Sequence, residues 1–179
     1  SDVCSSDLDA IVLNVDGPSG VVTADADLDG DLDILSSSFY DNKIALYGNI
    51  SIHKSAIFPT ETLISERVPI TYAFSVDVDR DGDLDILSAS YQHNEIAWHE
   101  NDGNQNFTEN IISTTALGVQ DISAEDVDGD GDLDLAAGNA PLCESWVSKS
   151  CSAFSGGANK LYLNDHGTLQ TAASWLSND

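Results

Sequence analysis

Residues 25–33 have the sequence DADLDGDLD, and this pattern is the strongest structural signal in the chain. It returns as DVDRDGDLD at residues 77–85 and as DVDGDGDLD at residues 126–134; we call these segments loop 1, loop 2 and loop 3. Each loop has Asp at positions 1, 3, 5, 7 and 9, Gly at position 6 and Leu at position 8. The loops start about 50 residues apart, which indicates a structural repeat of that length.

The similarity of the three units extends beyond the loops. An apolar segment precedes each loop, at residues 21–24, 72–76 and 119–123. Two more follow it, at residues 34–37 and 43–47, 86–89 and 95–99, and 135–138 and 160–163. The last of these leads in every unit to an Asn, which is Asn49, Asn101 or Asn164. A further apolar stretch lies at residues 62–64 and 110–112 of the first two units.

Short apolar runs separated by Asp, Gly and Asn turns favour strands over helices. No stretch keeps apolar residues at i, i+3, i+4 and i+7 for three helical turns. Residues 59–63 could begin a helix, but the matching segment 106–110 looks extended, so the repeat favours strand in both places. Each unit is therefore predicted to hold four short strands.

Four strands in about 50 residues is the period of a propeller blade. Several runs after the loops are apolar on both faces, which fits sheets packed between neighbouring blades. We predict an all-β chain of three four-stranded antiparallel units preceded by a strand remnant. The predicted boundaries are 9–19 for the last strand of a preceding blade, then 20–66, 67–115 and 116–179 for three blades, with an insertion at 140–158.

Residues 1–8 differ in character from the rest of the chain. Asp2 to Leu8 resemble the translation of an adapter oligonucleotide, so we predict a foreign N-terminus. These residues have neither the basic start nor the apolar core of a signal peptide.

The net charge of the chain is -25, from 31 acidic and 6 basic residues. This balance argues against binding to nucleic acid or to an anionic membrane surface, because both need clustered cations. Fifteen of the 31 acidic residues lie in the three loops. The negative charge is therefore concentrated in the three loops, where it could bind a cation.

The spacing of the Asp residues in each loop suits calcium, which prefers six to eight oxygen ligands. Side chains at positions 1, 3 and 5 of a tight loop can point at one ion, and Gly at position 6 allows the turn. A carbonyl at position 7 and a carboxylate at position 9 would complete the shell. Magnesium fits less well, because it demands octahedral geometry. An EF-hand is excluded, since position 12 is never Glu.

We therefore predict about three Ca²⁺ ions, one per loop, against the alternative of solvated acidic turns without metal. The predicted side-chain ligands stand at positions 1, 3, 5 and 9: Asp25, Asp27, Asp29 and Asp33; Asp77, Asp79, Asp81 and Asp85; Asp126, Asp128, Asp130 and Asp134. Position 7 is predicted to contribute its backbone carbonyl, from Asp31, Asp83 and Asp132. Position 8 is predicted to point into the core, through Leu32, Leu84 and Leu133.

Cys143 and Cys151 bracket a Ser- and Gly-rich insertion. A pair of cysteines that closes a short loop predicts a disulfide in an exported protein. Two free thiols are the alternative.

The pattern D-x-D-x-D-G-D-x-D followed by an apolar strand resembles the FG-GAP/VCBS repeat, similar to the blades of integrin alpha-chain propellers and of many bacterial secreted proteins. Residues 86–107 are especially similar to the bacterial form. The resemblance covers nearly everything after Leu8 and implies a β-propeller, calcium on the blade loops and a secreted or cell-surface location. Such propellers usually close with about seven blades, so three units imply a fragment of a larger propeller.

Two functional classes fit these features. The first is a non-catalytic calcium-binding module of a larger extracellular protein, for adhesion or for ligand or carbohydrate binding. Its partners would be a protein or glycan ligand and the remaining blades of its own chain, without membrane insertion. The second is part of a propeller-type polysaccharide lyase or glycoside hydrolase. We favour the first and predict no catalytic residue, because no nucleophile, zinc, phosphate-loop or dinucleotide motif is present.

Overall fold

The computed structural model describes residues 15–50, 61–139, 141–147, 150–156, 159–165 and 168–175, with side chains for 15–50, 61–139 and 159–164. Every regular element in this part of the chain is a β-strand. No described helix is long and apolar enough to span a membrane. The predicted foreign N-terminus lies outside the described residues, as does most of the predicted remnant at 9–19, whose Pro18 and Ser19 belong to the first strand.

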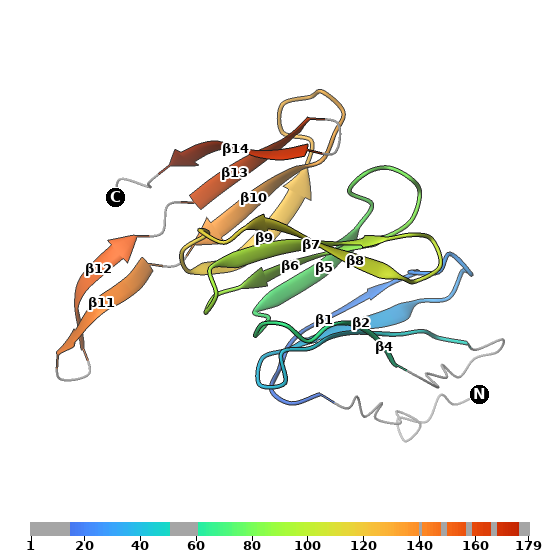
Figure 1. Cartoon of the computed structure of the whole chain (residues 1–179), viewed down its shortest axis with the longest axis horizontal. Coiled ribbons are helices and arrows are strands. Elements are labelled where there is room, and N and C mark those ends of the chain that lie inside the picture. The colour runs from blue at the N-terminus through green and yellow to red at the C-terminus, as the bar shows by residue number, and fades with distance from the viewer. Residues whose placement is uncertain are drawn as a thin grey trace, which may run out of the picture.

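Three four-stranded antiparallel sheets contain most of the strands (Figure 1). Blade 1 has the order β1 (Pro18–Ala24), β2 (Asp33–Ser38), β3 (Ile44–Tyr47), β4 (Glu61–Ser65). Blade 2 has the order β5 (Tyr72–Val76), β6 (Asp85–Ser90), β7 (Glu95–Asn101), β8 (Phe107–Ser113). Blade 3 has the order β9 (Val119–Glu125), β10 (Asp134–Asn139), β13 (Asn159–Asp165), β14 (Thr168–Trp175). The predicted all-β class with four-stranded antiparallel units is confirmed, and residues 61–63, which could have belonged to a helix, lie in strand β4.

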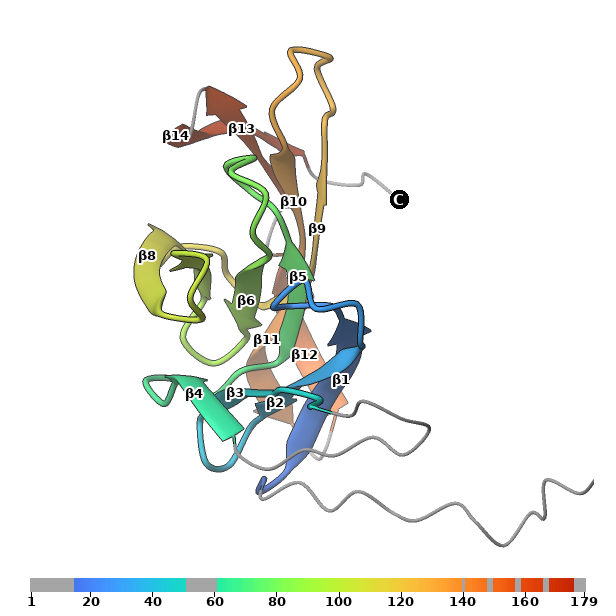
Figure 2. The same cartoon turned by 90° about the vertical axis from the view of Figure 1, so that its right-hand side faces the viewer.

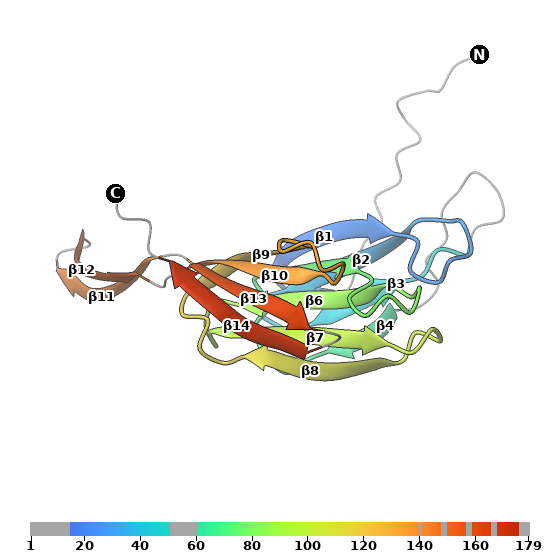
Figure 3. The ribbon, with the colours of Figure 1, turned by 90° about the horizontal axis from the view of Figure 1, so that it is seen from above.

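The insertion in blade 3 forms a separate hairpin of β11 (Pro141–Val147) and β12 (Ser150–Gly156). It projects away from the three sheets at one end of the molecule (Figure 3). The backbone pairing places Cys143 opposite Phe154 and Cys151 opposite Trp146. The side chains of both cysteines lie outside those described, so the disulfide stays a prediction.

Blade 2 lies between blade 1 and blade 3 (Figures 1 and 2). The three Asp loops join the first and second strands of the blades and lie along the same side of the array (Figure 1). Successive blades are therefore stacked in the same orientation, with corresponding loops next to one another.

Two apolar cores fill the spaces between the blades. The core between blades 1 and 2 consists of Leu35, Ile44, Val68, Ile70, Ala73 and Ile86. The core between blades 2 and 3 includes Leu87, Ala89, Ile96, Val119, Ile122, Leu135, Ala137 and Tyr162. Ile86 and Leu87 are adjacent on β6 and enter different cores, because successive strand residues point to opposite faces. The central strand β6 is thus apolar on both faces.

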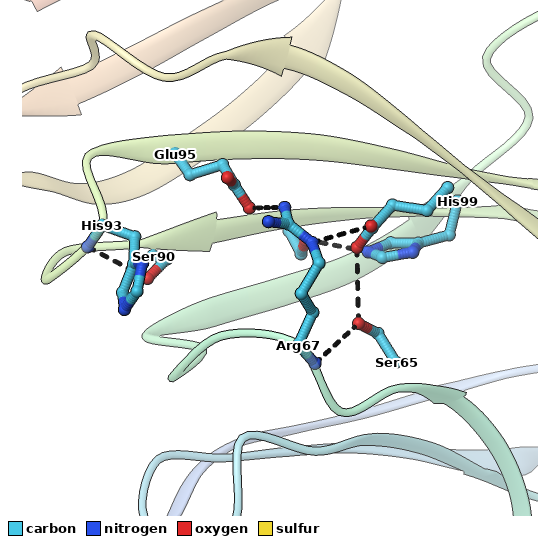
Figure 4. Close-up of polar contacts among 8 residues, drawn as sticks. Ser65, Arg67, Ser90, His93, Glu95 and His99 are labelled. Carbon is cyan, nitrogen blue, oxygen red and sulfur yellow. Dashed lines mark hydrogen bonds and ion pairs between the residues drawn. The ribbon is translucent and has the colours of Figure 1, made fainter.

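Arg67 fixes the link between blades 1 and 2 (Figure 4). It lies between β4 and β5, and its guanidinium forms ion pairs with Glu95 and Glu109 of blade 2. The distance from Arg67 Nε to Glu109 Oε2 is 2.8 Å. The Glu95 side chain is only 8% exposed, so this pairing supplies the positive charge that a buried carboxylate needs.

Candidate metal centres

Each Asp loop is closed by the same hydrogen bonds between its backbone and its own carboxylates. The N–H of position 5 donates to the side chain of position 3, that of position 6 to position 1, and that of position 7 to position 5. All nine distances lie between 2.8 and 3.2 Å. Position 6 has φ of 95–102° in the three loops, so the predicted glycine turn is confirmed.

This shared conformation gathers three carboxylates in every loop. Their nearest oxygen atoms lie within 4.8 Å of one another in the sets Asp25, Asp27 and Asp29; Asp77, Asp79 and Asp85; Asp126, Asp128 and Asp134. Positions 1 and 3 take part in all three sets. Position 5 completes the set in loop 1, whereas position 9 completes it in loops 2 and 3. Asp33, Asp81 and Asp130 were predicted as ligands and fall outside these sets.

Two carboxylate oxygens in the loops are buried without a hydrogen-bond partner: Oδ1 of Asp25 and Oδ1 of Asp77. A buried, unpaired acceptor costs free energy, which a bound cation would remove. A donor set made only of carboxylate oxygens matches a hard cation such as Ca²⁺. The residues present therefore fit the ion that the loop pattern implies.

The pKa values of several loop carboxylates are raised. Burial raises the pKa of Asp27 and Asp79, and neighbouring carboxylate charges add to the effect against an opposing backbone hydrogen bond. Burial also raises the pKa of Asp85 to about 6, although two backbone N–H groups donate to it. These carboxylates of loops 1 and 2 are thus electrostatically unfavourable in their ionised form, and a divalent cation would reverse the sign of these interactions.

The Asp at position 9 has a structural role that the sequence did not reveal. Asp33, Asp85 and Asp134 are fully buried. One carboxylate oxygen accepts the N–H of position 2 of the same loop, and the other accepts the N–H of the Asn at or near the end of the third strand. The six distances are 2.7–3.0 Å, and we call this arrangement the Asp–Asn clamp.

The side-chain amide of the Asn strengthens the Asp–Asn clamp. Nδ2 of Asn49 donates to the carbonyl of Leu32 at 3.3 Å, and Nδ2 of Asn101 donates to that of Leu84 at 3.1 Å. The clamp therefore ties the loop to the second and third strands of its blade. The recurring Asn was visible in the sequence, but its partner was not.

The prediction that position 8 points into the core is wrong. Leu32 is 59% exposed, and Leu84 and Leu133 are only half-buried. Position 2 is buried instead in loops 1 and 2, through Ala26 and Val78. The reason is the clamp, which turns position 9 inward; in extended backbone the preceding side chain then points outward.

His99 is part of the core and is not placed for catalysis. It is 1% exposed, and its Nε2 lies 3.0 Å from the hydroxyl of Ser88. Burial lowers the pKa of His99 to about 4, so the ring is neutral at pH 7. Tyr47 and Tyr162 occupy the equivalent position in the other blades, two residues before the Asn. A structural role explains this residue in all three blades.

Blade-like sheets with an Asp loop between the first two strands define a repeat protein. Residues 77–137 match the family model of the FG-GAP-like repeat. The match begins at the first Asp of loop 2 and ends in β10, so it includes loops 2 and 3. Over residues 77–137 this match agrees with the resemblance seen in the sequence. No curated protein and no solved structure matches the chain.

Proposed function

We propose that each Asp loop binds one Ca²⁺ and that the chain is a non-catalytic, calcium-stabilised repeat module of a larger extracellular protein. The observation that carries this proposal is the repetition of one geometry: three loops with the same hydrogen bonds, each bringing three carboxylates within 4.8 Å. The buried, unpaired oxygens of Asp25 and Asp77 support it further. An acidic turn adapted only to water would not need to bury them.

The role of the ion in this proposal is structural. The clamp couples each loop to two strands, so a ligand of the loop stabilises the whole blade. An extracellular setting supports the proposal that Ca²⁺ occupies the Asp loops, because extracellular calcium modules bind the ion with dissociation constants of about 10⁻⁴–10⁻³ M. Adhesion, or binding of a protein or glycan ligand, is the proposed task of the larger protein. The blades that complete a propeller would come from the rest of that protein.

A thermal melt with and without calcium tests the proposal. Binding to the native state alone adds RT ln(1 + [L]/Kd), about 2.7 kcal/mol per site at 100 times Kd. We expect the midpoint to rise in calcium and to return in excess chelator, with a smaller response to magnesium. Isothermal titration should give three sites in the wild type. An unchanged melt in millimolar calcium would contradict the proposal.

Position-3 variants assign the sites to the loops. Asp27→Asn, Asp79→Asn and Asp128→Asn should each reduce the stoichiometry by one. Asp121→Asn is the matched control, because it removes one exposed carboxylate of β9 outside the loops. The control should retain three sites. Loss of a site in the control as well would show that net charge, rather than loop geometry, governs binding.

The enzyme alternative gains no support from the described residues. His99, a candidate base by residue type, is buried against Ser88 and cannot reach an external substrate. Activity on a panel of polyuronates and neutral glycans, abolished by chelator, would favour the enzyme alternative over the binding module.

A further inference from the structure

Position 4 of each loop has left-handed backbone, where glycine is favoured. Loop 3 has Gly129 there, with φ of 81°. Loop 1 has Leu28 with φ of 59°, and loop 2 has Arg80 with φ of 63°. Left-handed backbone is strained for residues with a Cβ. Such strain, where it is observed, is a reason to look for what the side chain does.

The Arg80 side chain extends from loop 2 to loop 3. Its Nη1 lies 3.3 Å from the point that a Cβ on Gly131 would occupy. Gly131 is position 6 of loop 3, and its N–H donates to Oδ2 of Asp126 at 3.1 Å. The guanidinium of one blade therefore lies against the turn that holds the carboxylate cluster of the next blade.

The other basic side chains that the structure describes are engaged elsewhere. Lys43 pairs with Glu61, Arg67 pairs with carboxylates of blade 2, and Lys160 donates to Thr115. In the described part of the chain, Arg80 is thus the cation positioned at the Asp loops. The corresponding residue of loop 1, Leu28, is uncharged and 60% exposed.

We propose that Arg80 is an internal counter-cation for loop 3, which stabilises that loop without metal and weakens its affinity for calcium. A fixed positive charge reduces repulsion among the loop 3 carboxylates, and the same charge repels an incoming divalent ion. The calcium affinity of blade 3 is thereby set by a residue of blade 2. This inference rests on the proposed function, because it assumes that loop 3 binds calcium.

The test compares Arg80→Gly with the matched control Leu28→Gly. Both substitutions relieve the same backbone strain, but only the first removes a charge. Calcium affinity of loop 3 is measured by titration calorimetry in a background in which Asp27→Asn and Asp79→Asn disable the other loops. We expect Arg80→Gly to tighten binding by roughly 3- to 10-fold at low salt, with a smaller effect in 0.5 M NaCl. Leu28→Gly should leave the affinity unchanged, and Arg80→Lys should retain wild-type behaviour.

The melting temperature of the calcium-free protein is the second readout. Strain relief alone should raise the midpoint, as we expect for Leu28→Gly. Loss of the counter-cation should lower it in Arg80→Gly at low salt. If Arg80→Gly behaves like Leu28→Gly in both measurements, the counter-cation proposal is overturned while calcium binding stands. If the wild-type protein binds no calcium, the proposed function and the affinity part of this inference both fail.

Discussion

At the scale of single residues, the three blades use one position in different ways. The residue two places before the clamp Asn is Tyr47, His99 or Tyr162, and all three are buried. The Tyr47 hydroxyl donates to Glu61 at 2.9 Å, whereas His99 contacts the Ser88 hydroxyl. Because His99 is neutral in the folded protein, its protonation links the stability of blade 2 to pH.

We predict that His99 makes the protein acid-sensitive. Burial lowers its pKa to about 4, with opposing effects from Glu109 and Arg67, while the unfolded chain takes up a proton near pH 6.5. A histidine whose pKa is lower when folded contributes its full stability above pH 6.5 and loses it as the pH falls towards 4. The loss should approach ~3 kcal/mol.

His99→Tyr, which copies blades 1 and 3, should remove this part of the pH dependence. Urea denaturation of both proteins between pH 7.5 and 4 at constant calcium measures it. All other groups titrate in both proteins, so the difference between their free energies of unfolding at each pH isolates the contribution of His99. Parallel stability curves across this range would contradict the prediction; His99→Gln serves as a second variant.

At the scale of elements, blades 1 and 2 differ in the sign of the charge at one of two equivalent positions. Lys43 stands six places before its clamp Asn and pairs with Glu61 of β4 at 3.0 Å. The equivalent residue of blade 2 is Glu95, and the equivalent of Glu61 is Glu109 of β8. Both positions are thus acidic in blade 2, and Arg67 from the linker forms ion pairs with both residues.

We predict that Arg67→Met destabilises the protein by about 1–3 kcal/mol, because it leaves Glu95 buried without a counter-charge. The double variant Arg67→Met/Glu95→Lys should recover much of the loss. It gives blade 2 the Lys–Glu pair of blade 1. Urea denaturation of the single and double variants measures both effects.

If the Arg67→Met variant is as stable as the wild type, the ion pairs of Arg67 contribute nothing to stability. A double variant less stable than the single one would show that the two blades are not interchangeable at this site. Either outcome would contradict the proposed equivalence of the two charge arrangements.

The strands could be predicted from the sequence because their signals are local and occur three times. The carboxylate clusters at positions 1 and 3 followed from spacing for the same reason. The orientation of Leu32 could not be predicted from the sequence, since it depends on a clamp to Asn49, 17 residues away. The partners of Arg67 and Arg80 also lie on neighbouring blades, so only the stacking of the sheets reveals them.

At the scale of the whole molecule, the outer face of blade 3 differs from the two faces that blades cover. Ala136 and Asn159 stand where blade 2 has Leu87 and Ile96. Ser123 stands where blade 2 has Phe74. These smaller and more polar residues leave an open groove of about 250 Å³ on blade 3, lined by Asp121, Ile122, Ser123, Ala136, Ala137, Gly138 and Asn159. At these three described positions, this face therefore lacks the large apolar side chains that join blade 2 to blade 3.

We predict that changing the size of the side chain affects stability very differently at two equivalent positions. Leu87→Ala should cost about 2–5 kcal/mol, because it opens a cavity in the core between blades 2 and 3. Ala136→Leu should change stability by less than about 1 kcal/mol, since the added methyl groups enter the open groove. Urea denaturation of the two variants measures this difference. A large loss in Ala136→Leu would contradict the assignment of this face as open.

The Asp–Asn clamp holds every loop in shape through hydrogen bonds that involve no cation. A calcium messenger needs two distinct shapes between which the ion can choose. Because the clamp uses hydrogen bonds within the chain, the proposed calcium binding would change the shape of the loops little. We therefore expect the proposed calcium binding to slow proteolysis of the module, and to transmit no signal through it.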